Sequence, residues 1–306
     1  MPDLPRSFVA LGDSFTEGMQ DELGPDGRHL GWADRVAAAL AVATGGVRYA
    51  NLAVRGRLLD QVVDEQLPVA LALTPDLVSF HAGPNDALRP RTDIAGVLRR
   101  YDTAVAQLRA SSSTGSASTG SASTGSASTG SGGTGSGSTG SGSTGSGSTG
   151  SGSRVLLFTV LERAGGTGRT ADRLAARFAR FNDGVRATAR RHSALLVDVG
   201  PVAALHDRRL WHEDRLHLSP EGHARVAAAV LETLGVADPA LLGGAPGWWR
   251  EPLPPGPLPR RRADLAADVR WVRRHFLPWV GRRVRGVSSG DGITPKHTTL
   301  VDVLPR

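Results

Sequence analysis

The sequence predicts a three-layer α/β/α sandwich built around a five-stranded parallel sheet. Five short apolar runs alternate with segments of helical periodicity, and two of these runs are almost continuously aliphatic, which is typical of strands buried on both faces. Alternation of strands and helices indicates a parallel sheet with helices on both faces. The expected strands are Ser7–Leu11, Val47–Leu52, Asp76–Phe80, Val155–Val160 and Ala194–Val199.

The segments between these runs are expected to be helical. Their apolar residues recur at helical spacing. The last of them opens with Ser219-Pro220, a capping serine followed by a proline at the first helical position, which is a strong signal for a helix start. The expected helices cover about Trp32–Thr44, Leu58–Leu71, Ile94–Ala110, Ala171–His192 and Glu221–Leu234.

A low-complexity insert interrupts this pattern from Ser111 to Ser153. It is an uncharged, degenerate repeat of the form S-[AG]-S-T-G and has no apolar surface to bury, so we expect it to be disordered. A passive repeat or linker is the favoured interpretation, and a glycosylated or binding segment is the alternative. We therefore predict one domain over residues 1–236, interrupted by this insert, and a C-terminal extension over 237–306.

Charge and cysteine content exclude several classes of function. The sequence has no cysteine, which excludes disulfides, catalytic thiols and thiolate metal sites. Its formal net charge is +7, and the extension from Asp238 onward holds twelve basic and six acidic residues. Any anionic partner is therefore expected at the extension. The sequence contains neither a signal-peptide pattern nor an apolar run of about 18 residues, so we expect a cytoplasmic protein.

The extension is rich in proline, tryptophan and arginine and contains an amphipathic segment. Leu265, Val269, Val272, Phe276 and Val280 follow helical spacing, and Pro278 is expected to kink or end the helix. The favoured interpretation is that this apolar face packs on the domain or on a second subunit. Weak docking on an anionic membrane surface is the second interpretation, and no specific nucleic-acid partner is predicted.

Four segments carry residues suited to catalysis, and each follows a predicted strand. Because strands of a parallel sheet end at the same edge, these segments are expected to meet there. Serine, histidine and aspartate together can form a nucleophile, its general base and a group that orients the base. The segments are Gly12-Asp13-Ser14-Phe15, Asn51-Leu52-Ala53-Val54-Arg55-Gly56, Gly83-Pro84-Asn85-Asp86 and Asp214-Arg215-Leu216-His217.

In these four blocks the sequence resembles the SGNH hydrolases, the GDSL-type esterase/lipase family, and in Asn51–Asp60 and parts of the extension it looks like uncharacterised actinobacterial members. Phe15 replaces the leucine of the G-D-S-L signature. The fold expected is a three-layer sandwich with a five-stranded, flavodoxin-like parallel sheet, plus the basic extension. The resemblance implies Ser14 as nucleophile, His217 as general base and Asp214 as its partner. It also implies an oxyanion hole made of Ser14 N–H, Gly56 N–H and the Asn85 side chain.

The function predicted is therefore hydrolysis of a small or medium acyl ester, with a small-molecule ester as partner and without cofactor or metal. A catalytically silent binding or regulatory module with the same fold is the alternative. His212 and His223 lie near His217, but their spacing lacks a standard metal-ligand pattern. The loop Leu161–Thr170, with Glu162 and Arg163, is a candidate specificity element.

Overall fold

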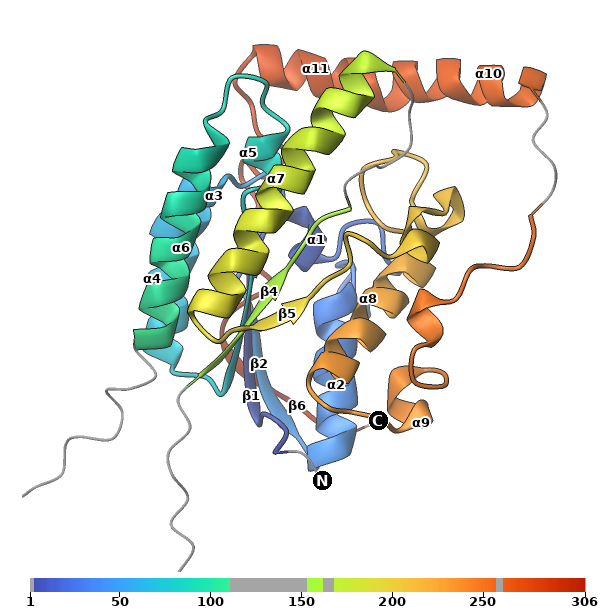
Figure 1. Cartoon of the computed structure of the whole chain (residues 1–306). Coiled ribbons are helices and arrows are strands. Elements are labelled where there is room, and N and C mark those ends of the chain that lie inside the picture. The colour runs from blue at the N-terminus through green and yellow to red at the C-terminus, as the bar shows by residue number, and fades with distance from the viewer. Residues whose placement is uncertain (1–2, 111–152, 162–167, 257–260, 306) are drawn as a thin grey trace, which may run out of the picture.

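A computed structural model describes residues 3–110, 153–161, 168–256 and 261–305. A central sheet lies between two layers of helices (Figure 1). Five parallel strands have the order 2-1-3-4-5, the flavodoxin-like arrangement. They are β1 (Ser7–Gly12), β2 (Val47–Asn51), β3 (Leu77–His81), β4 (Arg154–Phe158) and β5 (Leu195–Val197).

Two hydrophobic cores, one on each face of the sheet, hold the layers together. One face is covered by α2 (Trp32–Thr44), α8 (Pro220–Thr233) and α9 (Pro239–Leu242). The other is covered by α3 (Leu59–Gln61), α4 (Leu67–Leu73), α6 (Ile94–Ala110) and α7 (Arg169–Arg191). The expected layers and helices are confirmed, and Ser219 caps α8 by accepting a hydrogen bond from Gly222 N.

The prediction of a purely parallel, five-stranded sheet is wrong in one respect. A sixth strand, β6 (His297–Val303), pairs antiparallel with β2 and makes the sheet mixed. Its β-branched residues suit a strand, and its half-exposed pattern suits an edge. The C-terminal end of the predicted extension is thus a part of the central sheet, although the division at residue 236 itself stays a prediction.

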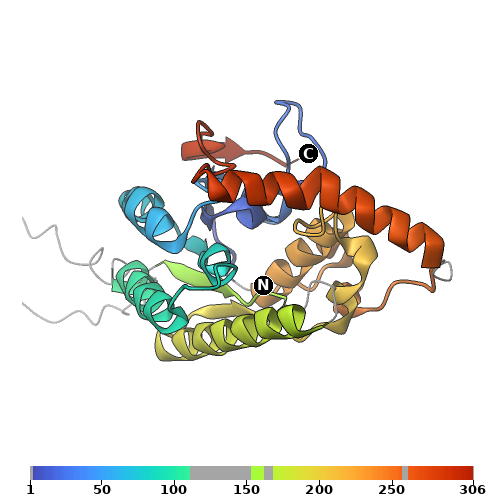
Figure 2. The same ribbon diagram turned by 90° about the horizontal axis from the view of Figure 1, so that it is seen from above.

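The rest of the extension forms a long helix that crosses the carboxyl edge of the sheet (Figure 2). It consists of α10 (Arg261–Trp271), a π-helical turn (Val272–Phe276) and α11 (Leu277–Val284). Pro278 was predicted to kink or end this helix. It does not end it, because the helix continues for six residues beyond Pro278. The wider π-helical turn before Pro278 accommodates the missing N–H and the bulk of the ring.

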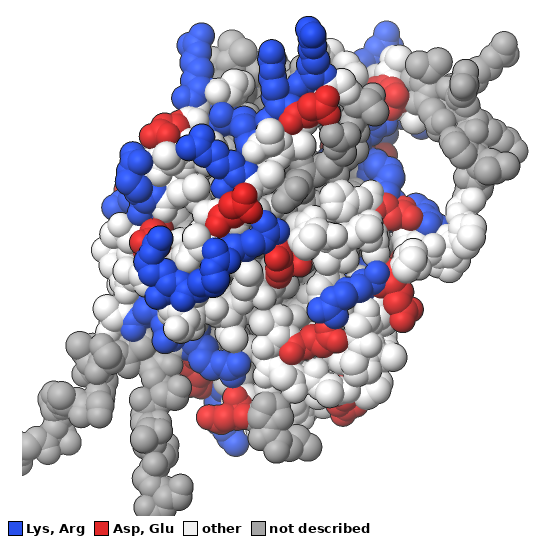
Figure 3. All heavy atoms as spheres, viewed as in Figure 1, with Lys and Arg blue, Asp and Glu red and all other residues white. Residues whose placement is uncertain are grey.

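The predicted apolar face of this helix is covered only in part, with Val272 and Val280 half-buried. Val269 and Phe276 remain 53% and 41% exposed, and at Leu265 the structure describes the backbone alone. Lys and Arg side chains project from the same rim of the molecule in Figure 3. Trp271, Asp268 and His275 contact the domain through polar atoms. Binding of the basic extension to an anionic surface or a second subunit stays a prediction.

Residues 111–152 and 162–167 lie outside the described residues. The structure therefore does not test the predictions made for the repeat and for Glu162 and Arg163. Among the helices that the structure does describe, none is long and apolar enough to cross a membrane.

Candidate active site

The loops that follow β1, β3 and β5 line one cavity of about 290 Å³ at the carboxyl edge of the sheet. Ser14, Asn85 and His217 all lie in its wall, so the structure brings together three predicted site residues from distant parts of the sequence. Asp214 contacts His217 from behind the wall, and Gly56 is not part of the lining.

Ser14 is the first residue of the short helix α1 (Ser14–Glu17), directly after β1. The Asp13 side chain caps this helix by accepting a hydrogen bond from Phe15 N at 3.1 Å. At the other end of the helix, the buried Glu17 carboxylate accepts from Arg55 N at 2.6 Å and from Arg55 Nε at 2.8 Å. The serine and the loop that carries Gly56 are therefore fixed to each other.

His217 and Asp214 form a hydrogen-bonded pair. His217 Nδ1 lies 2.8 Å from Asp214 Oδ2, while Asp214 Oδ1 accepts from Leu216 N at 2.9 Å and from His217 N at 3.0 Å. Burial alone would raise the pKa of Asp214, but its hydrogen bonds and the charge of His217 outweigh burial and lower the pKa below its ordinary value. A charged acceptor at Nδ1 fixes the tautomer in which Nε2 is free to take a proton.

In the resting structure, no hydrogen bond joins the described side chains of Ser14 and His217, although both line the same cavity. Such catalytic hydrogen bonds commonly form or tighten only when the substrate is bound. Ser14 and His217 therefore share one cavity without a direct hydrogen bond between their side chains.

Asn85 lies at the start of the short helix α5 (Pro84–Ala87). Its side-chain amide donates to Asp13 Oδ2 at 3.1 Å and to the Arg57 carbonyl at 3.0 Å. An oxyanion in the cavity would therefore have to share or replace one of these bonds. Asp86 accepts from Leu59 N at 2.9 Å and so joins this turn to the start of α3.

Gly56 has a φ of +75°, a left-handed conformation that favours glycine. A Cβ at this position would collide with the hydroxyls of Ser288 and Ser289, from the C-terminal extension. The extension therefore packs closely on the loop expected to donate to the oxyanion.

The wall of the cavity is mainly apolar. An apolar recess next to a nucleophile can hold the hydrocarbon part of an acyl group. The apolar lining includes Phe15, Leu88, Val160, Leu161, Leu174 and Phe178.

His223 also reaches this wall, and its bonding identifies it as a packed, neutral histidine. Its Nε2 donates to the Met19 carbonyl (3.1 Å), and its Nδ1 accepts from Trp32 N (3.3 Å). Burial lowers its pKa to about 4. His212 Nδ1 accepts from Asp214 N at 3.3 Å, so it serves the turn before His217. Within the described part of the chain, no group of three or more histidine, aspartate or glutamate side chains could hold a metal ion.

Sequence reasoning missed several neighbours of the His217–Asp214 pair. Gln20 Nε2 donates to Asp214 Oδ2 at 3.4 Å, and Trp271 Nε1 donates to the Asp214 carbonyl at 2.7 Å. The concentration of tryptophans in the extension was a signal that it packs on something, but the sequence did not indicate where.

The mostly parallel α/β sheet has an apolar, histidine-bearing cavity at its carboxyl edge, where folds of this class bind their ligands. Residues 10–133 match the model of the GDSL-like lipase/acylhydrolase family. The match includes Ser14, Gly56 and Asn85 but not Asp214 and His217. It confirms the predicted family and the predicted class of enzyme, a hydrolase acting on carboxylic esters.

Solved structures of low sequence identity share the fold. LAE5, an α/β hydrolase from the metagenome of Lake Arreo, Spain, is 20% identical with a TM-score of 0.51, over 75% of this chain and 95% of its own. Axe2, an acetylxylan esterase from Geobacillus stearothermophilus, is 17% identical with a TM-score of 0.52, over 76% and 94%. The esterase EstA from Pseudoalteromonas sp. is 11% identical with a TM-score of 0.51, over 75% and 97%. No curated protein is similar enough in sequence to count as a match.

Proposed function

We propose that the chain hydrolyses acyl esters through a Ser14–His217–Asp214 triad. The observation that carries this proposal is the 2.8 Å contact between His217 and Asp214 at the wall of a cavity that Ser14 also lines. The fold shared with esterases supports the same reaction.

In the first half of the reaction, Ser14 Oγ bonds to the ester carbonyl carbon while His217 Nε2 takes the hydroxyl proton. Asp214 holds the imidazole in place and stabilises its protonated form. When the tetrahedral intermediate collapses, the bond to the alcohol oxygen breaks and His217 returns the proton to this oxygen. Water then repeats the sequence on the acyl-enzyme, which releases the acid and regenerates Ser14.

The negative charge on the former carbonyl oxygen requires donors. Ser14 N–H, Gly56 N–H and the Asn85 amide are the donors proposed, with Asn85 exchanging one of its resting hydrogen bonds for the oxyanion. A donor of this kind contributes about 3 kcal/mol to transition-state stabilisation.

The cavity favours an acyl chain of small to medium length. Its volume of about 290 Å³ is at the lower end of the range for small-molecule sites, and its lining is mostly apolar. We therefore expect higher kcat/KM for short and medium p-nitrophenyl esters than for the palmitate.

The test is a panel of p-nitrophenyl esters from acetate to palmitate, measured on the wild type, Ser14→Ala and Asp214→Asn. Ser14→Ala should abolish turnover, and Asp214→Asn should lower kcat by about 10²- to 10⁴-fold because the imidazole loses its orienting partner.

Asp207→Asn is the matched control. Asp207 accepts a hydrogen bond from the backbone N–H of Arg209, two residues later, as Asp214 does from Leu216, but it lies outside the cavity lining. Its activity should stay within about twofold of wild type, the spread we allow for a surface carboxylate. Turnover that survives Ser14→Ala would refute the proposal. Absence of turnover in the wild type on every ester, acetylated sugars included, would favour a silent binding module.

A further inference from the structure

The long C-terminal helix contacts the turn that carries Asp214 and His217. Three consecutive residues of this turn make these contacts. Glu213 lies 3.4 Å from His275 Nε2, Asp214 accepts from Trp271 through its backbone carbonyl, and Arg215 forms an ion pair with Asp268. The helix crosses the carboxyl edge of the sheet (Figure 2). His217, on the same turn, lines the cavity, so these contacts lie beside it.

The turn is held in an unfavourable backbone conformation. Arg215 has a φ of +59°, in the left-handed region that residues other than glycine seldom adopt. Such a conformation persists only where surrounding contacts enforce it, and it is found mostly at functional sites. Here, Arg215 stands between the two members of the proposed acid–base pair, so relaxation of its backbone would move Asp214 relative to His217.

Trp271 restrains this turn on both sides of the strained residue. Its indole N–H donates to the Asp214 carbonyl at 2.7 Å, which fixes the peptide that precedes Arg215. Its ring lies under the Arg215 guanidinium, with 4.9 Å from Cζ to the ring centroid. One side chain therefore holds the backbone before Arg215 and the side chain of Arg215 itself.

The helix that carries Trp271 is tethered at both ends. Before it, the carbonyls of Trp249 and Glu251 accept hydrogen bonds from Arg225 on α8, at 3.2 and 2.6 Å. After it, Lys296 donates to the Leu30 carbonyl and to Asp34, and β6 joins the sheet. These anchors keep Trp271 in a defined position although much of the helix surface is exposed.

We infer that Trp271 is a positioning residue for the reaction. Its indole N–H keeps the 214–217 turn in the conformation that aligns His217, so it acts on the chemical step through Asp214. This inference rests on the triad proposed above. Loss of the N–H should therefore lower kcat and leave KM close to wild type, because Trp271 is not among the residues that line the cavity.

Trp271→Phe removes the N–H and retains an aromatic ring beneath Arg215. The chain offers a close control, Trp248→Phe. The Trp248 indole donates to the Leu242 carbonyl at 2.9 Å and lies under the Arg225 guanidinium at 5.2 Å. These are the same two kinds of contact, and none of the three residues lines the cavity. A purely structural role would give both variants the same effect on Tm and on kcat.

The p-nitrophenyl ester that the wild type cleaves best serves as substrate, and Ser14→Ala is measured beside both variants. We expect kcat of Trp271→Phe to fall roughly 3- to 10-fold, as for loss of one hydrogen bond, with KM within about twofold. Trp248→Phe should retain wild-type kcat and KM. Trp271→Ala should lower kcat at least as much as Trp271→Phe.

Two results would overturn the inference. The first is a Trp271→Phe variant with wild-type kcat, whether or not Trp271→Ala is impaired, since the N–H would then have no effect on the reaction. The second is an equal loss of kcat in Trp248→Phe, which would show a general effect of tryptophan replacement. If Ser14→Ala itself remained active, the triad would be refuted instead, and this outcome is distinguishable because it does not depend on Trp271.

Discussion

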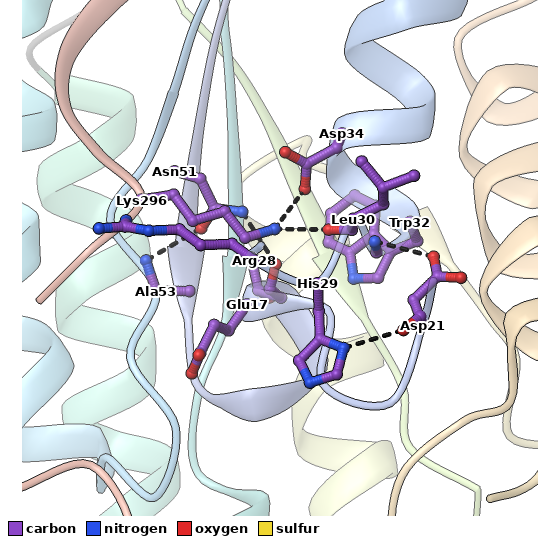
Figure 4. A network of polar contacts seen from close by, with 12 residues as sticks. Glu17, Asp21, Arg28, His29, Leu30, Trp32, Asp34, Asn51, Ala53 and Lys296 are labelled. Carbon is purple, nitrogen blue, oxygen red and sulfur yellow. Dashed lines mark hydrogen bonds and ion pairs between the residues drawn. The ribbon is translucent and has the colours of Figure 1, made fainter. Parts of the chain in front are cut away.

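Replacing Lys296 by methionine should destabilise the protein much more at pH 8 than at pH 5. Lys296 is the only lysine of the sequence, and its side chain is 6% exposed. Its Nζ donates to Asp34 Oδ2 at 2.6 Å and to the Leu30 carbonyl at 2.5 Å (Figure 4). Asp34 lies on α2, so this pair joins the C-terminal extension to the domain.

The sign of the pH effect follows from Asp34. Burial raises its pKa to about 6, and Lys296 opposes this rise. A carboxyl whose pKa is raised by folding makes the folded protein less stable as the pH rises from the pKa of the unfolded state toward the pKa of the folded state. Without Lys296 the folded pKa is higher still, so the variant continues to lose stability above pH 6, whereas the wild type does not. At pH 5, Asp34 is mostly protonated in both proteins.

The size of the effect follows from the same linkage. Between pH 6 and pH 8, each pH unit contributes at most about 1.4 kcal/mol, so the extra loss at pH 8 is bounded at about 3 kcal/mol. For a domain of this size, this corresponds to a Tm decrease of about 5–10 °C beyond the decrease at pH 5.

Urea unfolding of the wild type and Lys296→Met at pH 5 and pH 8 measures this difference. Arg99→Met is the control, because the Arg99–Asp93 pair is exposed (73% and 68%) and should contribute less than about 1 kcal/mol at either pH. The double variant Asp34→Asn, Lys296→Met should lose the pH dependence. An equal loss of stability at pH 5 and pH 8 would refute the argument, because Asp34 would then not be a buried partner of Lys296.

Three further predictions address the oxyanion donor, the packed histidine and the insert. Asn85→Ala should lower kcat about 10²- to 10³-fold with little change in KM, and a raised KM at unchanged kcat would make Asn85 a substrate-positioning residue instead. Because the pKa of His223 is lowered in the folded state, the protein should lose up to about 3 kcal/mol of stability as the pH falls from about 6.5 to about 4. His223→Gln should make stability less dependent on pH in that range. Replacing residues 111–152 by a four-residue, glycine-containing turn should leave kcat/KM within about twofold and add at most about 2 kcal/mol of stability. A short turn can join the two ends, since Arg109 Nη1 already donates to the Ser153 carbonyl at 3.2 Å. A tenfold loss of activity in a folded variant would contradict this prediction.

The parallel strands and the helices α2 and α6 could be predicted because the signals for them lie within their own segments. The five parallel strands coincide with short, largely apolar runs of the sequence. The bounds of α2 and α6 agree with the predicted ones because their periodicity and their ends lie within the segment itself. The position of Ser14, Asn85 and His217 could be predicted because each follows a strand of a parallel sheet, and such strands end at a common edge.

The partner of a strand is not a local signal. The residues of β6 are rich in β-branched types, so its tendency to form a strand was visible in the sequence. Its partner β2 lies about 250 residues earlier, and nothing within either segment specifies this pairing. The contacts of the long helix were missed for a related reason. The spacing of its apolar residues indicated a packing face, whereas Trp271, Asp268 and His275 make the contacts through polar atoms.

The direction of β6 explains why the extension reaches the candidate active site. Because β6 is antiparallel to β2, its first residue, His297, lies opposite Asn51 at the carboxyl edge, and Val303 lies opposite Val47 at the other edge. The chain before β6 must therefore approach along the carboxyl edge, where Gly56 and the turn of Asp214 also lie. A parallel sixth strand would have placed the preceding helix at the opposite edge, remote from both. The pairing that the sequence could not reveal is thus the one that brings Trp271 to the Asp214 carbonyl.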